Sequence, residues 1–296
     1  MEAVQRQQRR STLASHAHIL AKKAAKLGLD QATRIQASLL RLLRTIDFPV
    51  PSYTQMLGIG SHSIRHYYES GINCYLPIAV AALQAKVDLR SPIRVLDFGC
   101  GAGRQLLHFT RRFPAPSYHA CDVNGPAMQF VRRHFPQVRA MQNAFRPPLP
   151  FNDGHFDMIY SVSVFSHLGP DDQRLWLKEL ARITTPGGSC FLTTEGPTAV
   201  AQMAPHELAE HVAVRREALA SRGLIFSEYA DRQAQKENER VLPFGSKYLG
   251  IEGTYGTTAM SPDYILEHWT EFGFAVDTIL EGIIDHRQDL VVLRRA

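Results

Sequence analysis

The stretch from Arg94 to Arg104, with the sequence RVLDFGCGAGR, limits the fold of this chain more than any other. Val95 and Leu96 begin a short apolar run that suits a buried parallel strand, and Asp97 ends it. Glycines follow at positions 99, 101 and 103, and a helical pattern begins at position 105. Because glycine has no Cβ, the backbone can turn sharply and approach a ligand closely. A strand, a glycine turn and a helix in this order predict the nucleotide site of a doubly wound α/β fold.

The acidic residue before the glycines narrows the choice of ligand. A pyrophosphate would lie at the N-terminus of the helix, where the Asp97 carboxylate would repel it. S-adenosylmethionine (SAM) has no phosphate and carries two cationic groups, a sulfonium and an ammonium, which a carboxylate attracts. The stretch resembles the first motif of class I SAM-dependent methyltransferases, in which an acidic residue precedes Gly-x-Gly-x-Gly. A dinucleotide oxidoreductase is the alternative that the glycine spacing alone leaves open.

A second acidic residue follows at the distance expected for a ribose contact. Residues 118–121 are expected to form the second strand, which ends at Asp122, 122 − 103 = 19 positions after Gly103. In such folds an acid about 20 residues further on accepts hydrogen bonds from the ribose hydroxyls. Asp122 and Val123 also resemble the second motif of the family. The alternative is that Asp122 only caps the helix that begins near Pro126.

The third and fourth strands add the remaining cofactor positions. We expect the third strand over residues 138–142, and Asn143 stands where the family usually has an aspartate that contacts the adenine amine. The amide oxygen of Asn143 can still accept that hydrogen bond. The fourth strand is expected over residues 158–161. The resemblance then implies these cofactor-binding residues: Asp97, Gly99, Cys100, Gly101, Gly103, Asp122, Val123, Asn143, Ala144, Phe145 and Ser161.

Two residues beyond the fourth and fifth strands are candidates for catalysis. His167 follows the fourth strand, where ligands bind in open α/β sheets, and its ordinary pKa lies near neutrality. Glu195 follows the fifth strand, expected over residues 190–194, as a base or an amine ligand. The structural alternative for His167 is a hydrogen bond to the loop backbone or a stack on adenine. The alternative for Glu195 is a solvated loop position.

The expected substrate contacts are aromatic and lie outside these cofactor motifs. They are Tyr67, Tyr68, Phe165 and Tyr255. For Tyr67 and Tyr68 simple aromatic packing is the alternative. Residues 197–258 interrupt the core pattern and are too long for an ordinary connection, so we expect them to form a substrate lid. A purely structural excursion is the other interpretation of this insertion.

The positive charge of the chain lies at its N-terminus. Residues 1–48 hold nine basic and three acidic residues, 9 − 3 = +6, whereas the remainder holds 24 − 25 = −1. Apolar residues recur there at near-helical spacing, from Ile19 to Leu43. We expect a helical cap whose apolar stripe packs on the body or on a second subunit. A basic amphipathic segment for an anionic membrane, a glycan or nucleic acid is the alternative.

Several classes of protein are disfavoured by composition. No apolar run approaches the roughly 18 residues that indicate a membrane span, and no secretory signal is evident, so we expect a cytoplasmic protein. Four cysteines lie far apart without the spacing of a metal site, so we expect no metal. The near-neutral body and the lack of an Asn-Pro-Pro-Tyr or Asp-Pro-Pro-Tyr element after the fourth strand argue against a nucleic-acid acceptor.

These patterns predict an α/β, Rossmann-like class I methyltransferase fold: a seven-stranded, mostly parallel sheet with helices on both faces. We divide the chain into an N-terminal helical cap (1–90) and a SAM-binding domain (91–296) that includes the lid (197–258). The resemblance implies methyl transfer from SAM to an oxygen or nitrogen of a small-molecule or saccharide acceptor, with S-adenosylhomocysteine as product. A protein acceptor and a non-catalytic SAM-binding scaffold are the alternatives. A homodimer through the N-terminal helices is a further hypothesis.

Overall fold

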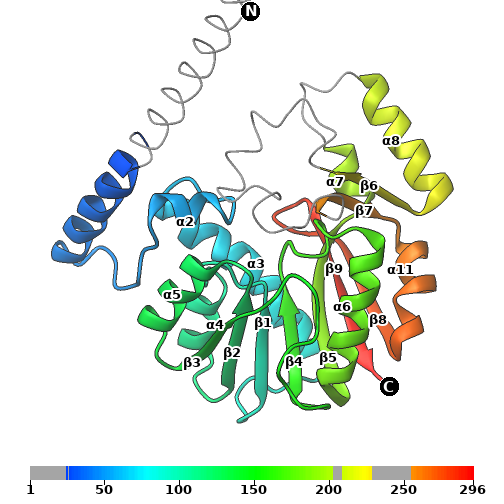
Figure 1. The fold of residues 1–296 in the computed structure, drawn as a ribbon, viewed down its shortest axis with the longest axis horizontal. Coiled ribbons are helices and arrows are strands. Elements are labelled where there is room, and N and C mark those ends of the chain that lie inside the picture. Colours follow the sequence, from blue (N-terminus) through cyan, green and yellow to red (C-terminus); the bar gives the residue numbers. More distant parts are fainter. Residues whose placement is uncertain (1–24, 26, 203–208, 229–254) are drawn as a thin grey trace, which may run out of the picture.

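One mixed sheet forms the centre of the computed structural model, which describes residues 25, 27–202, 209–228 and 255–296 (Figure 1). Strands β3, β2, β1, β4 and β5 lie side by side and parallel. Strand β9 follows antiparallel to β5, and β8 pairs with β9. The bounds are β1 Arg94–Phe98, β2 Ser117–Asp122, β3 Val138–Gln142, β4 Phe156–Ser161, β5 Thr184–Glu195, β6 Leu224–Glu228, β7 Gly256–Met260, β8 Phe274–Ile284 and β9 Gln288–Arg295.

Alternating side chains give the sheet two apolar cores, one on each face. In β1, Val95 packs in the core with α3, α4 and α5, and the next residue, Leu96, packs in the core with α6 and α11. Helices therefore cover both faces, as predicted. Their bounds are α2 Tyr53–Leu57, α3 Ile64–Gln84, α4 Leu106–Arg112, α5 Gly125–His134, α6 Pro170–Ile183, α7 Pro197–Ala201, α8 Ala209–Arg222 and α11 Pro262–His268.

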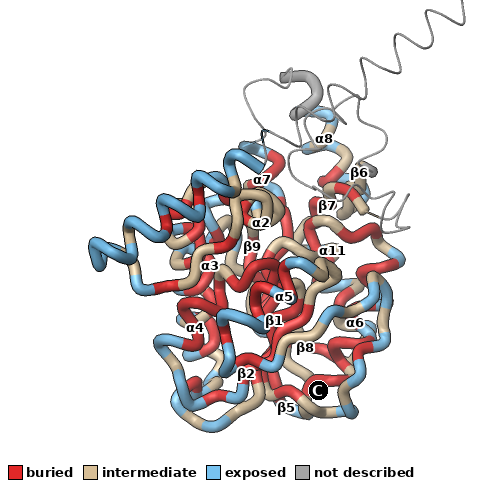
Figure 2. Tube along the Cα trace, turned by 60° about the vertical axis from the view of Figure 1, so that its left-hand side comes forward, coloured by how far each residue is buried: buried red, intermediate tan, exposed pale blue. Residues whose placement is uncertain are grey.

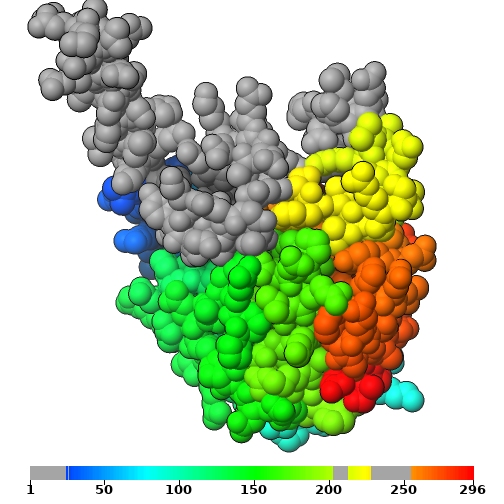
Figure 3. Space-filling view, turned by 45° about the vertical axis from the view of Figure 1, so that its right-hand side comes forward, coloured from blue at the N-terminus to red at the C-terminus, as the bar shows by residue number. Residues whose placement is uncertain are grey.

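The strand count differs from the prediction, because the described residues form nine strands instead of seven. The two additional strands, β6 and β7, form an antiparallel hairpin from the predicted lid, and β7 joins the end of β5 through the pair Glu195–Ala259. Helix α8 leads into this hairpin and lies beside α11, with the Ser261 N–H donating to the Gly223 carbonyl at 2.7 Å (Figure 3). The remainder of the predicted lid, residues 229–254, lies outside the described residues.

The order of the strands reverses between β1 and β4. The chain runs from β1 to β2 and β3 on one side of β1, and then returns to β4 on the other side. The carboxyl ends of β1 and β4 therefore open a crevice at this switch point, which is where open α/β sheets bind ligands. The glycine loop, Asp122, Asn143 and His167 follow or end strands β1 to β4 at this edge.

The N-terminal helices differ from the prediction in which side chains they bury. Residues 27–42 are helical, and the face that packs on the body carries Thr33, Ala37 and the partly buried Leu40. Most of the predicted apolar stripe, including Leu39 and Leu42, is instead exposed, so its packing on the body is wrong for these residues (Figure 2). The earlier part of the stripe, residues 19–24, lies outside the described residues.

Helix α3 spans 21 residues. It runs without a break through Pro77, although proline removes one helical hydrogen bond, because much of its length is buried against the sheet. Ser63 caps its start by accepting a hydrogen bond from the His66 N–H.

Within the parts of the chain that the structure describes, no helix combines the length and apolar character of a membrane span. The boundary between a cap and a body near residue 90 stays a prediction.

Candidate active site

The glycine loop after β1 disfavours any side chain at two positions. Gly99 and Gly101 have φ values of 76° and 52°, in the left-handed region that side chains disfavour. A Cβ on Gly99 would lie 2.2 Å from Val164 Cγ2, and one on Gly101 would lie 2.4 Å from Ile59 Cγ2. The loop therefore passes closely under two neighbouring segments, one after β4 and one after α2.

Asp122 at the end of β2 is bonded to this loop. Its carboxylate accepts hydrogen bonds from the Gly101 N–H and from the Asn124 N–H, both at 2.8 Å. Burial raises the pKa of Asp122, and the two backbone bonds oppose that shift. The capping residue of α5 is Asn124, which accepts from the Ala127 N–H, so the alternative role of Asp122 as a helix cap is wrong. A carboxylate has about four acceptor positions, so Asp122 can accept further bonds from hydroxyl groups.

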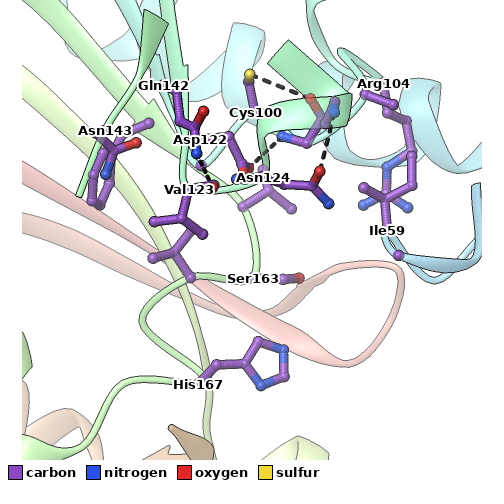
Figure 4. A pocket seen from close by; sticks show the side chains of 18 of the residues that line it. Ile59, Cys100, Arg104, Asp122, Val123, Asn124, Gln142, Asn143, Ser163 and His167 are labelled. Atoms are coloured by element: carbon purple, nitrogen blue, oxygen red, sulfur yellow. Dashed lines mark hydrogen bonds between the residues drawn. The ribbon is translucent and has the colours of Figure 1, made fainter. Parts of the chain in front are cut away.

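A cavity of about 500 Å³ lies at this edge of the sheet (Figure 4). The structure brings nine of the predicted site residues together around it: Gly99, Cys100, Gly101, Asp122, Val123, Asn143, Phe145, His167 and Tyr255. In Figure 4, Asp122 and Gln142 lie at one side of the cavity, His167 at another, and Arg104 with Ile59 at a third. The nucleotide motif and the catalytic candidate His167 therefore face one space.

Four predicted cofactor residues support the cavity without lining it: Asp97, Gly103, Ala144 and Ser161. Asp97 is buried beneath the loop, and burial raises its pKa to about 8. Gly103 has a φ of 74° and faces Phe135, and Ala144 is exposed. Ser161 is fully buried in β4, one residue before Val162, which does line the cavity.

His167 is held by the strand that enters from the insertion. Its Nδ1 lies 2.9 Å from the Gly256 carbonyl oxygen, which can only accept, so Nδ1 carries the proton and Nε2 is the basic nitrogen of the neutral ring. Burial lowers the pKa of His167, and the bond to Gly256 opposes the shift. The Tyr255 ring stacks on the imidazole at 5.5 Å. The predicted backbone bond of His167 thus exists, and burial, not this bond, favours the neutral imidazole.

Glu195 is neither solvated nor part of the cavity wall. Its side chain is buried, and its Oε1 accepts a hydrogen bond from Arg287 at 2.6 Å. Arg287 lies in the turn between β8 and β9, so the ion pair joins that turn to the end of β5. Both members of the pair act on His167: the negative charge of Glu195 raises the pKa of the imidazole, and the positive charge of Arg287 lowers it. Glu195 therefore lies close enough to act on the charge of His167, but outside the residues that line the cavity.

Three predicted substrate contacts are core residues instead. Tyr67 is fully buried in α3, and its hydroxyl donates to the Ala102 carbonyl at 3.1 Å, which supports the glycine loop from below. Tyr68 stacks on Phe48 with ring centroids 4.9 Å apart. Phe165 is fully buried and packs on Trp269 at 5.2 Å. Aromatic packing, the alternative for the two tyrosines, is what the structure shows.

Several residues that line the cavity escaped the sequence analysis. They include Gln55, Gly58, Ile59 and Gly60 around α2, together with Arg104, Ser163, Val164 and Trp176. The Gly58–Gly60 turn after a short capped helix was the available signal for the α2 segment. Arg104 follows the glycines directly, and its buried Nε has no hydrogen-bond partner among the described residues. A guanidinium there can hold a carboxylate.

A glycine turn, an acid at the end of the adjoining strand and a cavity at the switch point define a Rossmann-like cofactor-binding protein. Residues 95–188 match the model of a family described as a methyltransferase domain. Similar curated proteins include the malonyl-[acyl-carrier protein] O-methyltransferase of Halorhodospira halophila, which is 31% identical over 47% of this chain and 50% of its own length. A probable phthiotriol/phenolphthiotriol dimycocerosates methyltransferase 2 of Mycobacterium ulcerans is also 31% identical, over 54% of this chain and 65% of its own.

The chain thus spans half to two thirds of the length of these two relatives. Among solved structures, a SAM-dependent methyltransferase from Mesorhizobium loti aligns with a TM-score of 0.50 and 16% identity, over 73% of this chain and 96% of its own. That likeness confirms the fold. Residues 95–188 thus match a methyltransferase domain, and the motifs and the fold of this chain are similar to those of class I SAM-dependent methyltransferases.

The residues present fit SAM. The buried Oδ1 of Asn143 lines the cavity without a partner among the described residues and can accept from an adenine amine. The buried Oδ2 of Asp97 likewise has no partner there, next to the loop where the cationic end of SAM would lie. The described ranges hold no group of three or more His, Cys, Asp or Glu side chains that could bind a metal ion.

Proposed function

We propose that this chain transfers the methyl group of SAM to an oxygen or nitrogen of a small-molecule acceptor. One observation carries the proposal: the glycine loop, Asp122 and the imidazole of His167 line the same cavity of about 500 Å³. That volume is within the range of pockets that take a small cofactor with part of a substrate. A saccharide acceptor is included, since its hydroxyl would need a base.

The residues of this chain would share the work as follows. Asp122 would accept from the ribose hydroxyls and Asn143 from the adenine amine, while Arg104 would hold the carboxylate of SAM. When bound, SAM supplies an electrophilic methyl group on a good leaving group. Alignment of the acceptor then supplies much of the rate, on the order of 7 to 11 kcal/mol.

His167 would serve as the general base. Its Nδ1 is engaged by Gly256, so Nε2 would take the proton from an acceptor hydroxyl or ammonium. Glu195 would act through His167 by stabilising the imidazolium that forms, because its charge raises the pKa of that ring, an effect that its partner Arg287 opposes. Glu195 is thus a positioning residue in this proposal and does not touch the acceptor.

The test is transfer of label from methyl-labelled SAM into a cell extract that is separated into small-molecule, glycan and protein fractions. Label in the small-molecule or glycan fraction supports the proposal if Asp122→Ala abolishes it and the exposed control Asp153→Ala does not. Label that protease releases from the protein fraction would favour a protein acceptor. SAM binding without label in any fraction would contradict the proposal in favour of a non-catalytic scaffold.

A further inference from the structure

The helix over residues 27–42 has two faces of different character (Figures 1 and 2). Its inner face packs on the body through Thr33, Ala37 and Leu40. The same face carries Asp30, whose carboxylate accepts from the Thr54 N–H at 2.8 Å and from the Thr54 hydroxyl at 3.2 Å. The helix is therefore attached to α2 in a fixed rotational position, and its opposite face is turned away from the body.

That outer face is apolar. Ile35, Leu39 and Leu42 recur at i, i+4 and i+7, so they lie along one side of the helix, and Leu43 extends the row. All of them are exposed, Leu39 by 54% and Leu42 by 79%. Water-exposed leucines scattered singly are ordinary, but a row of them on one helix indicates a binding surface.

Basic residues accompany this apolar row. Arg34, Arg41 and Arg44 are exposed on the same segment. Of its two described acids, Asp30 is bonded to Thr54 and Asp47 is paired with Arg111. The sequence of residues 1–48 carries +6, against −1 for the rest of the chain. An apolar row beside basic residues is the pattern of helices that lie in the interface of an anionic membrane.

The charge also decides against a second copy of the chain as the occupant. In a two-fold interface the same surface meets itself, so Arg34, Arg41 and Arg44 of one copy would meet those of the other. That arrangement places like charges opposite one another and is repelled. An anionic lipid surface instead attracts the charge and accepts the leucines at once.

We propose that the outer face of helix 27–42 docks this protein on an anionic lipid membrane. The leucines would enter the boundary between head groups and acyl chains, and the arginines would contact acidic head groups. The helix is joined to the site through Thr54, because the next residue, Gln55, lines the cavity. The docking surface would thus lie beside the cavity, so the membrane becomes a source from which an acceptor can enter. The binding itself does not depend on the proposed methyl transfer.

The experiment is sedimentation of the full chain with vesicles, and it needs no activity. Wild-type protein should sediment with vesicles of phosphatidylcholine and phosphatidylglycerol, and much less with pure phosphatidylcholine. L39Q/L42Q should bind at least about tenfold more weakly, because each leucine contributes on the order of 1.5 to 3 kcal/mol when buried. L175Q/L266Q is the matched control, because these leucines are exposed singly on α6 and α11, by 43% and 50%, and it should bind like wild type.

The charge contribution has its own variant. Arg34→Gln combined with Arg44→Gln should weaken binding to the anionic vesicles by about fivefold for each charge and leave binding to pure phosphatidylcholine unchanged. All four leucine and arginine positions are exposed, so equal melting temperatures would verify that the variants fold. Undiminished sedimentation of L39Q/L42Q, or no sedimentation of the wild type, would overturn the proposal. A wild-type dimer in the absence of lipid that L39Q/L42Q dissociates would overturn it in favour of a second copy.

Discussion

The Asp122 carboxylate accepts a hydrogen bond from the Gly101 N–H at 2.8 Å, so the end of the second strand holds the glycine loop of the first. The same carboxylate also accepts from Asn124 at the start of α5. One side chain therefore organises two turns of the cofactor site and can still accept bonds from a ligand. This relationship sets the first prediction.

Replacing Asp122 with alanine should weaken SAM binding by at least about tenfold. Each hydrogen bond to a charged group contributes about 1.5 to 3 kcal/mol, and the variant would remove the proposed bonds to ribose together with the one that fixes Gly101. Isothermal titration with SAM measures the effect, and Asp153→Ala is the control because its side chain is exposed. Equal affinity in Asp122→Ala and the control would show that Asp122 does not contact the cofactor.

Replacing Gly101 with alanine should perturb the protein more than replacing Gly187, another glycine with positive φ, does. Both Gly101 and Gly187 have positive φ, but a Cβ on Gly187 meets nothing within 4 Å, whereas one on Gly101 meets Ile59 at 2.4 Å. Gly187→Ala should cost about 1 kcal/mol of stability from backbone strain alone. Gly101→Ala should show that loss and also a reduced SAM affinity, and equal SAM affinities for the two variants would contradict the close approach to Ile59.

The pKa of Asp97 predicts how stability depends on pH in the absence of SAM. Its folded pKa of about 8 lies above its ordinary value of 3.8, so the folded protein holds a proton that the unfolded chain releases. The contribution of protonated Asp97 to the free energy of unfolding is fully present below pH 3.8. It falls as the pH rises towards 8, by up to about 1.4 kcal/mol per pH unit. Asp97→Asn should remove this part of the slope in urea unfolding between those values.

The control for this measurement is Asp153→Asn, which changes an exposed carboxyl group and should keep the wild-type slope. If Asp97→Asn also kept it, the buried carboxyl group would already be ionised in the folded protein at neutral pH. The comparison uses slopes, so a constant loss of stability in either variant does not affect it.

Replacing His167 with asparagine should lower kcat by about 100-fold or more while the SAM affinity stays close to wild type. The asparagine amide can still donate towards Gly256, but the basic Nε2 is lost, and a general base contributes about 10² to 10⁴ in rate. Because burial lowers the pKa of His167 below 6.5, the acidic fall of kcat in the wild type should lie below pH 6.5. His134→Asn, at an exposed position, is the control, and an unchanged kcat in His167→Asn would remove the base from the mechanism.

Replacing Tyr67 with phenylalanine should affect stability and leave turnover within about twofold. The lost hydrogen bond to the Ala102 carbonyl contributes about 1 kcal/mol, and the ring keeps its packing. Thermal unfolding and the KM of the acceptor measure the two effects. A large rise in the acceptor KM with unchanged stability would restore Tyr67 as a substrate contact.

The sequence predicted the parts of this molecule that local rules determine. The glycine loop and Asp122 are recognisable because a tight turn demands glycine and a strand end presents its acid at the switch point. Val164 and Phe165 show where this reasoning stops. They are neighbours in one loop, yet Val164 lines the cavity and Phe165 packs on Trp269. Which of two adjacent side chains faces a cavity depends on the position of distant elements.

The outward-facing leucines of the N-terminal helix illustrate the same limit. Their spacing predicts a helix with an apolar stripe, and the helix is present over residues 27–42. The rotation of that helix is determined by the Asp30–Thr54 contact, which joins residues 24 positions apart. A periodic pattern carries no information about such a contact, so the sequence left open whether these leucines pack on the body, where the structure does not place them, or on a second subunit.

The connection between β7 and the loop after β4 limits how this protein can be engineered. The Gly256 N–H donates to the His167 carbonyl, the Thr258 N–H to the Ser166 carbonyl and the Thr258 hydroxyl to the Leu168 carbonyl. Strand β7 of the inserted segment is thus hydrogen-bonded to three successive residues of the loop after β4, Ser166, His167 and Leu168. A chimera that takes only residues 197–258 from a relative would disrupt these hydrogen bonds and misplace the His167 imidazole. Exchange of acceptor preference between relatives therefore requires grafting both pieces as a single cassette.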